Sequence, residues 1–378
     1  MANNAQNIRS LDFGQRYFKH LSPQVADVLS LLQGEERIAF KGGIAKLCLM
    51  AAMIEHENLK DMKRWRLEQR INDIDLVFIF PSGQDDLKEM ILEKFERTKN
   101  ILLSRNIYLD PRDVDIIEDV NLEKALARIL GSDDLTINEV ALIFVAGKWR
   151  LFYSDLALDH TVRGIGMIAK PKTTNIHYDA GRIYFSPLGV VRLIKFLASC
   201  KVQKICLPKW RLGLLFDNYQ KKVKAGQMPQ NAPLGFYSLV LMKNYFGNDE
   251  LAQKKAMVVL YDLGLTDMLD PELYVRQQEA IFADAHKEFA LKEFTMEEIV
   301  DKYIENRSKR EAAAKERQAT RANCAHEFEA VPCELCGQNK CEIRYCQKCG
   351  KNQNAQPLPC TLRMWQGVCD PKDFYSLK

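Results

Sequence analysis

The stretch RINDIDLVFIF (residues 70–80) places two aspartates directly before five apolar residues. The apolar run is typical of a buried strand. Because side chains alternate across a strand, Asp73 and Asp75 are expected on one face. Two carboxylates held this close repel each other unless a cation lies between them, and Mg²⁺ prefers such oxygen ligands. The stretch predicts a divalent-metal site, although on its own it also fits a strand-entry turn with two solvated aspartates.

A glycine turn lies earlier in the chain. The segment FKGGIAK (residues 40–46) is predicted to be a strand that leads through Gly42 and Gly43 into a helix. Glycines at such a turn let backbone amides approach a phosphate, at the positive end of the following helix. A strand, Gly-Gly, a helix and then Asp-x-Asp on the next strand, here Asp73 and Asp75, resemble the nucleotidyltransferase superfamily typified by DNA polymerase β.

Three later stretches narrow this resemblance. DDLTINEVAL (133–142), SPLGVVRLIKF (186–196) and LYDLGLTDMLDPEL (260–273) are similar, in the same order, to RRDFTINAL, DPLRILRAIRF and GLL…LFPEL. These motifs are found in the poly(A) polymerase and CCA-adding tRNA nucleotidyltransferase family. The chain resembles that family over residues 36–275.

The resemblance implies an α+β fold, with a nucleotidyltransferase head built on a small mixed sheet and a helical neck and body. It implies Mg²⁺-dependent transfer of a nucleoside monophosphate, with ATP as the expected donor, to an RNA 3′ end such as that of tRNA. Asp73 and Asp75 match the catalytic metal pair. The matched nucleotide-binding positions are Gly42, Gly43, Lys46, Asp134, Asn138, Arg192 and Lys195.

The chain also departs from the family pattern. Lys46 replaces an arginine and keeps its charge but not its planar fork. Ser132 and Asp133 replace the arginines of the RRD motif, and Gly189 replaces the first arginine of the neck motif. The base-selecting half of the site is therefore altered more than the metal-binding half.

Two alternative functions follow from these departures. A degenerate transferase fold could serve as a non-catalytic RNA- or ribonucleoprotein-binding subunit. The pattern KGG…R…DIDLVF is also similar to the nucleotidyltransferase-like toxins of abortive-infection systems, which would modify tRNA or protein. In that branch Arg70 would contact the triphosphate.

A third carboxylate commonly completes such a metal site from a neighbouring strand. The hairpin predicted from EVALIFVAGKWRLFYSDL (139–156), with its turn at Ala146-Gly147-Lys148, brings Glu139 and Asp155 into consideration. Asp134 is the third candidate, and the sequence does not choose among them.

Eight of the eleven cysteines lie between Cys324 and Cys369. CELCG (333–337) and CQKCG (346–350) are two Cys-x-x-Cys-Gly knuckles, a pattern that predicts a closed, structural zinc site in a ribbon. The expected zinc ligands are Cys333, Cys336, Cys346 and Cys349. Further candidates, for a second site or as replacements within the first, are Cys324, His326, Cys341 and Cys360.

Basic residues surround this predicted ribbon. Arg307, Lys309, Arg310, Lys315, Arg317 and Arg321 precede it, and Lys340, Arg344, Tyr345, Lys348 and Lys351 lie within it. Basic groups with an aromatic side chain fit contact with single-stranded RNA. A solvated helix followed by a ribbon that binds a protein partner is the alternative.

Length and composition set the remaining limits. The chain has 378 residues and a net charge of +4, contains no apolar run long enough for a membrane span, and begins without a secretory signal pattern. We therefore expect no membrane partner and a cytoplasmic or other reducing intracellular location. The predicted segments are an N-terminal helical segment (1–35), the head (36–180), a helical neck and body (181–300), a basic helical linker (301–322) and the zinc-ribbon tail (323–378).

Overall fold

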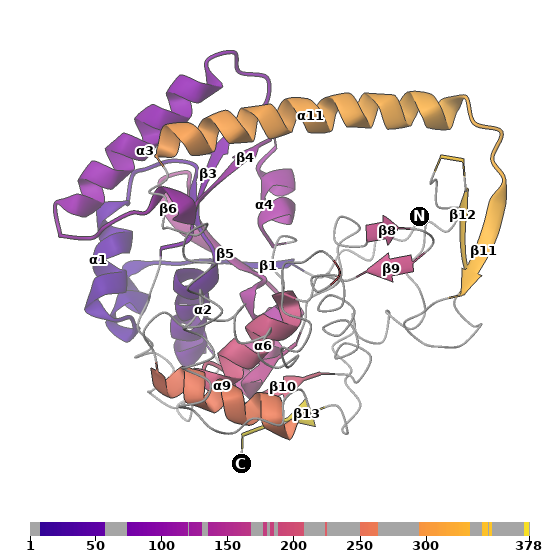
Figure 1. The fold of residues 1–378 in the computed structure, drawn as a ribbon. Helices are drawn as coiled ribbons and strands as arrows, with labels where there is room; N and C mark the ends of the chain where they lie inside the picture. Colours follow the sequence, from indigo (N-terminus) through magenta and orange to yellow (C-terminus); the bar gives the residue numbers. More distant parts are fainter. Residues whose placement is uncertain are drawn as a thin grey trace.

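The protein was studied as a computed structural model. The structure describes residues 8–56, 74–119, 121–130, 135–167, 177–179, 182–184, 188–207, 224, 250–263, 295–332, 342–346, 348–349 and 374–377. Its central feature is a six-stranded mixed sheet that is covered by helices on both faces (Figure 1). The expected α+β class with a small mixed sheet is thus confirmed.

The sheet has the strand order β1-β6-β5-β2-β3-β4. Its strands are β1 (Ile8–Asp12), β2 (Ile38–Phe40), β3 (Leu76–Phe80), β4 (Val114–Glu118), β5 (Val140–Val145) and β6 (Lys148–Ser154). Only β3 and β4 pair in parallel, and the other neighbours are antiparallel. As a result, the end of β2 and the starts of β3, β4 and β5 lie along one edge of the sheet.

Alternating side chains build a separate apolar layer on each face of the sheet. On one face, Phe40, Leu76 and Phe78 pack against α1 (Pro23–Leu31), α2 (Gly42–His56) and α3 (Leu87–Leu103). On the other face, Val77 and Ile79 pack against α4 (Leu122–Leu130). Ile74 belongs to the first layer, so the intervening Asp75 lies on the α4 side of its strand.

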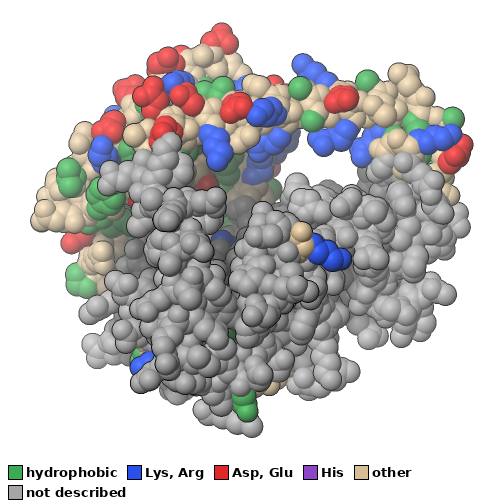
Figure 2. Space-filling view, viewed as in Figure 1, with side chains coloured by type: hydrophobic (Ala, Val, Ile, Leu, Met, Phe, Trp, Pro, Cys, Tyr) green, Lys and Arg blue, Asp and Glu red, His purple; other side chains and the backbone are tan. Residues whose placement is uncertain are grey.

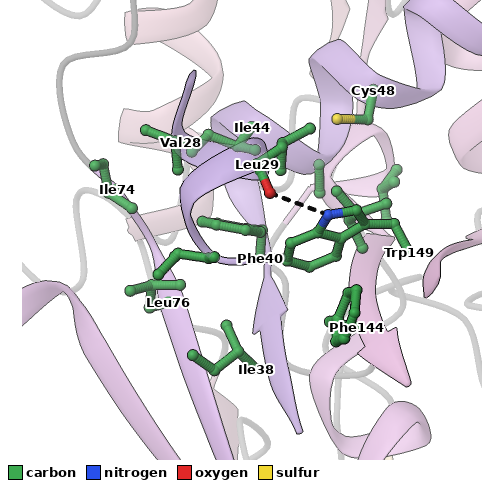
Figure 3. Close-up of a cluster of buried hydrophobic side chains, with 14 of the residues drawn as sticks. Val28, Leu29, Ile38, Phe40, Ile44, Cys48, Ile74, Leu76, Phe144 and Trp149 are labelled. Atoms are coloured by element: carbon green, nitrogen blue, oxygen red, sulfur yellow. Dashed lines mark hydrogen bonds between the residues drawn. The ribbon is translucent and has the colours of Figure 1, made fainter. Parts of the chain in front are cut away.

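One buried hydrogen bond ties the sheet to α1. The indole N–H of Trp149, on β6, donates to the carbonyl of Leu29 at 3.2 Å (Figure 3). The Trp149 ring also packs against Phe40 and Phe144, with ring centroids 5.5 and 5.1 Å away. The apolar layer under α1 and α2 is therefore fixed by both ring contacts and a polar anchor.

The predicted hairpin is confirmed. β5 and β6 are joined by Ala146 and Gly147, whose φ angles of 52° and 75° are the positive values that a tight hairpin turn requires. The helix predicted after the glycine turn is α2.

The N-terminal segment joins the head. Within residues 1–35 the structure places η1 (Gln15–His20) and α1, as the helical prediction requires, but it begins with β1. This strand pairs with β6 from Ile8 opposite Ser154 to Asp12 opposite Arg150.

Much of the predicted neck and body lies outside the described residues. Its described parts include α6 (Leu188–Ala198) and α9 (Glu250–Asp262), which pack together, and the strands β9 (Arg182–Tyr184) and β10 (Lys204–Cys206). The strands β7 (Ile165–Gly166) and β8 (His177–Asp179) lie in the range predicted for the head, and β13 (Phe374–Tyr375) lies in the range predicted for the tail. The short helices η3 (Pro111–Asp113), η4 (Thr136–Asn138) and α5 (Asp155–Arg163) belong to the head.

The basic linker is a single long helix, α11 (Met296–Ala322). It begins at Thr295, which forms a capping box with Glu298. Met296 and Val300 are buried in the core beside α3, so the first turns are packed against the head and only the later turns extend away (Figure 1). The helix leads to the hairpin of β11 (Phe328–Pro332) and β12 (Glu342–Cys346).

None of the helices within the described residues combines the length and apolarity that crossing a membrane would require.

Candidate functional site at the sheet edge

The glycine turn meets the aspartate strand at one edge of the sheet. The backbone N–H of Lys41 donates to the carbonyl of Asp75 at 3.1 Å, so the β2–β3 ladder continues one residue past Phe40. Gly42 follows with φ +60° and begins α2. A β-carbon on Gly42 would lie 2.1 Å from Asp75 Oδ2. The Asp75 carboxylate and the first turn of α2 are therefore in direct contact.

A second carboxylate pair lies at the start of the neighbouring strand, β4. In RDVDIIE (112–118), Asp113 and Asp115 stand before an apolar run just as Asp73 and Asp75 do in the opening stretch. β4 pairs in parallel with β3, and Asp115 lies opposite Val77. The side chain of Asp115 is 56% exposed and forms an ion pair with the ammonium group of Lys41. The sequence interpretation missed this pair, although its Asp-x-Asp spacing was a usable signal.

Of the three candidates for the third carboxylate, the structure describes two. Asp134 lies outside the described residues. Glu139 is buried, at 3% exposed, and accepts a hydrogen bond of 2.6 Å from the hydroxyl of Ser154. Asp155 forms an ion pair of 2.5 Å with Arg9 of β1. Among the described carboxylates considered, Asp115 is thus the one that is exposed on the strand next to Asp75.

A cleft of about 500 Å³ opens beside Asp115, between the α4 face of the sheet and α11. Its lining is Val77, Ser82, Asp115, Ile116, Ile117, Glu118, Arg128, Ile129, Tyr303, Arg307, Arg310 and Glu311. Arginines from two helices therefore face carboxylates of β4 across a shared space.

Buried Glu118 fixes α11 over this cleft. Its side chain is 8% exposed, receives a hydrogen bond of 3.0 Å from the hydroxyl of Tyr303, and lies 2.8 Å from Nη1 of Arg307. Burial, together with the negative charge of Glu118, raises the pKa of Tyr303 to about 12, so the phenol keeps its proton. Arg128 donates to the Glu118 carbonyl at 2.6 Å.

Lys46 lies in a different environment from the one expected for a triphosphate contact. It is 6% exposed, with its ammonium 5.1 Å from the centre of the Phe196 ring. It lines a second, small cavity with His160, Lys201 and other residues of α2, η4, α5 and the segment that follows α6, and neither Gly42 nor Asp75 contributes to that lining. Burial, reinforced by the charge of Lys201, lowers the pKa of Lys46 to about 7.

The last three residues of the DDLTIN motif, Thr136 to Asn138, form η4 beside this second cavity. The hydroxyl of Thr136 lies 2.6 Å from Nδ1 of buried His160, and burial lowers the pKa of that imidazole to about 4, so it is neutral at pH 7. Asn138 is partly exposed at the end of η4. On α6, Arg192 and Lys195 are both partly buried.

Several predicted site residues cannot be placed. Asp73, Arg70 and Asp134 lie outside the described residues, as do Cys333, Cys336, Cys341 and Cys360. Gly43 is described, and the position of its missing side chain opens into free space.

The C-terminal knuckle contributes to a cluster that could hold a metal ion. Cys346 and Cys349 meet Cys324 and His326, and their ligand atoms all lie within 4.8 Å of one another. Burial opposes ionisation of Cys346, but a hydrogen bond from His326 and three from backbone N–H groups outweigh it and lower the pKa of this thiol. Outside this cluster, Cys206 is disulfide-bonded.

Comparisons with known proteins give weak likenesses only. No protein-family model matches the sequence, and no curated protein matches it. Among solved structures, a CCA-adding enzyme in its apo form I is similar at 13% identity and a TM-score of 0.40, over 67% of this chain and 54% of the enzyme. The Thermotoga maritima CCA-adding enzyme complexed with tRNA is similar at 14% identity and a TM-score of 0.39, over 68% of this chain and 55% of the enzyme. A complex of CCA-adding enzyme with ATP is similar at 13% identity and a TM-score of 0.40, over 75% of this chain and 63% of the enzyme.

This chain therefore spans about half the length of the first two of these enzymes. At such identities and TM-scores the likenesses establish nothing about its activity or its ligands.

Proposed function

We propose that this protein is an RNA 3′-end nucleotidyltransferase. In the proposed reaction the RNA 3′ oxygen attacks the α-phosphorus of a nucleoside triphosphate, ATP being the expected donor. The bond between that phosphorus and the bridging oxygen breaks, and pyrophosphate leaves. The observation that carries the proposal is the contact between Gly42, at the start of α2, and the carboxylate of Asp75.

The start of α2 suits a triphosphate. Backbone N–H groups in the first turn of a helix lack partners within the helix and carry the positive end of its dipole. At Gly43 no atom lies within 4 Å of the position that a side chain would occupy, so the backbone is open to a phosphate group there. Asp75 lies beside the same turn, which would bring metal ligands next to the bound phosphates.

The donors at the edge fit a magnesium ion. Carboxylate oxygens are the ligands that Mg²⁺ takes in such sites, usually together with water and phosphate oxygens. Asp75 would hold the ion with Asp73, and Asp115 is the exposed carboxylate on the adjacent strand. When bound, Mg²⁺ would neutralise charge on the phosphates and on the attacking oxygen. The ammonium group of Lys41 balances the charge of Asp115 when no Mg²⁺ is bound.

The α11 helix provides a surface for the RNA strand. From Ser308 to Ala322 it carries five basic and two acidic residues. Figure 2 shows lysine and arginine side chains along this helix. With 3.6 residues per turn, Arg310, Arg317 and Arg321 fall on the same face of α11 as Tyr303 and Arg307, which line the cleft. An arginine stripe of this kind fits the phosphates of a single strand leading to the cleft.

A labelling assay tests the proposal. Purified protein is incubated with each labelled nucleoside triphosphate, Mg²⁺ and short RNAs, and the RNA is examined for added nucleotides. We expect one nucleotide to be incorporated, and Asp75→Asn to abolish incorporation. Asp27→Asn is the matched control, because Asp27 is an exposed carboxylate on α1, on the other face of the sheet.

Absence of incorporation with every nucleotide, or incorporation that survives in Asp75→Asn, would overturn the proposal. RNA binding without turnover would instead favour the binding-subunit alternative. Label transferred to protein or to internal tRNA positions would favour the toxin-like alternative.

A further inference from the structure

The end of α11 and the turn after β12 meet through four sulfur and nitrogen donors. Cys324 and His326 lie between Ala322, the last residue of α11, and the first residue of β11. Cys346 is the last residue of β12 and is paired opposite Phe328. Because the hairpin is antiparallel, its register brings the residues that precede β11 alongside the residues that follow β12, including Cys349.

The distances in this cluster fit a tetrahedral metal site. Cys324 Sγ and Cys346 Sγ are 3.6 Å apart, and Cys349 Sγ lies 3.4 Å from Nδ1 of His326. Zinc bonds of about 2.3 Å to sulfur and 2.0–2.1 Å to nitrogen place tetrahedral ligands roughly 3.5–3.8 Å from each other. A disulfide requires a sulfur separation of about 2.0 Å, so Cys324 and Cys346 are not bonded to each other.

The surroundings suit a structural zinc site. Cys346 is fully buried, and its sulfur accepts hydrogen bonds from the backbone N–H groups of Glu327, Lys348 and Cys349. Such bonds stabilise a thiolate and orient it as a ligand. Lys348, which follows β12, also forms an ion pair with Glu327, which precedes β11. All four positions are occupied by protein donors, which is the arrangement of a closed site without an open coordination position.

We propose that Cys324, His326, Cys346 and Cys349 together bind one zinc ion. This ligand set differs from the one predicted from the two knuckles, because the second knuckle is completed by the end of α11. The ion would fasten the C-terminal end of α11 to the β11–β12 hairpin. Because the N-terminal part of α11 is held on the head by Glu118, the helix would be anchored at both ends.

Metal content of the full chain tests this proposal. Zinc per chain is measured by elemental mass spectrometry for the wild type, for Cys324→Ser and His326→Ala, and for Cys333→Ser as the matched variant of the first knuckle. We expect Cys324→Ser and His326→Ala each to lose one zinc per chain relative to the wild type. The ion at this site should remain in Cys333→Ser.

The absorption spectrum of Co²⁺ bound in place of zinc reports the ligands directly. It therefore does not depend on a loss of metal, which a poorly folded variant would also show. In the wild type, Co²⁺ should give the absorption of a tetrahedral site with three thiolates. His326→Cys should keep the metal and shift the spectrum to that of a site with four thiolates, while Cys333→Ser should leave the three-thiolate spectrum unchanged. A wild type without zinc, a four-thiolate wild-type spectrum, or a His326→Cys spectrum identical to the wild type would overturn the proposal.

Discussion

The carboxylate of Asp75 fills the space beside Gly42 into which any side chain at that position would project. A β-carbon there would lie 2.1 Å from Oδ2, and the φ angle of +60° is one that residues other than glycine adopt at a cost of roughly 1–2 kcal/mol. Gly42→Ala must therefore displace Asp75 or shift the start of α2. We expect a lower melting temperature and a large loss of nucleotide incorporation, measured by thermal unfolding and by the labelling assay.

Gly14→Ala is the control for this prediction. Gly14 has φ −92° and no atom within 4 Å of the added carbon, so the alanine should be tolerated. Wild-type stability and activity in Gly42→Ala would show that the contact with Asp75 does not constrain the site.

Buried Lys46 makes stability depend on pH. Its pKa is lowered to about 7 in the folded protein, from 10.5 for an ordinary lysine, so between these values the unfolded chain binds more protons than the folded one. The free energy of unfolding contributed by this group therefore rises with pH across that window. Below pH 7 the folded protein carries a buried charge, at a cost on the order of a few kcal/mol, since a tenfold change in proton affinity corresponds to about 1.4 kcal/mol.

Lys46→Met should consequently be more stable than the wild type near pH 6, with a difference that shrinks as the pH approaches 10.5. Denaturant unfolding at several pH values measures this. Lys309→Met, at an exposed position on α11, should give no such trend. A stability difference for Lys46→Met that is the same at all pH values would contradict the assigned burial.

The fold was largely predictable because local patterns decide it. The apolar run from Leu76 to Phe80 can only be a buried strand in this context, and the Ala146-Gly147 turn is a strong hairpin signal. What the sequence does not contain is the pairing of distant strands. β4 could be recognised as a neighbour of β3 only in the structure, and this is why Asp115 is not among the sequence candidates Asp134, Glu139 and Asp155.

Long-range packing also explains the other differences. Residues 301–322 are predicted to form a basic, solvated helix, yet Tyr303 and Arg307 in its first turns bind the buried side chain of Glu118. In the same way, matched knuckles suggested that Cys333 and Cys336 complete the zinc site. The hairpin register brings Cys324 and His326, which the sequence offers only as further candidates, to the second knuckle.

The arginine stripe on α11 should govern RNA affinity. Arg317 and Arg321 are exposed on the face that leads to the cleft. Arg317→Gln with Arg321→Gln should weaken binding of single-stranded RNA and reduce the slope of log affinity against log salt by roughly 1.4, because each phosphate contact contributes about 0.7. Fluorescence anisotropy at several salt concentrations measures both quantities.

Lys309→Gln with Lys315→Gln is the matched control for the stripe. These two lysines are equally exposed on α11 but lie on other faces of the helix, so the same loss of charge should have the smaller effect. Equal effects of the two double variants would indicate that RNA responds to net charge and not to a defined face.

The ion pair between Glu118 and Arg307 should decide whether α11 stays docked. Arg307→Met leaves the nearly buried carboxylate of Glu118 without its ion-pair partner, although it still accepts the hydrogen bond from the Tyr303 hydroxyl, and this should destabilise the protein by about 1–3 kcal/mol. It should also expose α11 to limited proteolysis before the head unfolds.

Glu118→Gln in the same chain should recover part of the loss, because an uncharged amide needs no counter-charge in that position. Arg317→Met removes an exposed arginine and should leave stability unchanged. Additive effects of Arg307→Met and Glu118→Gln in the double variant would mean that the two side chains do not interact, and that other contacts, such as those of Met296 and Val300, hold the helix on the head.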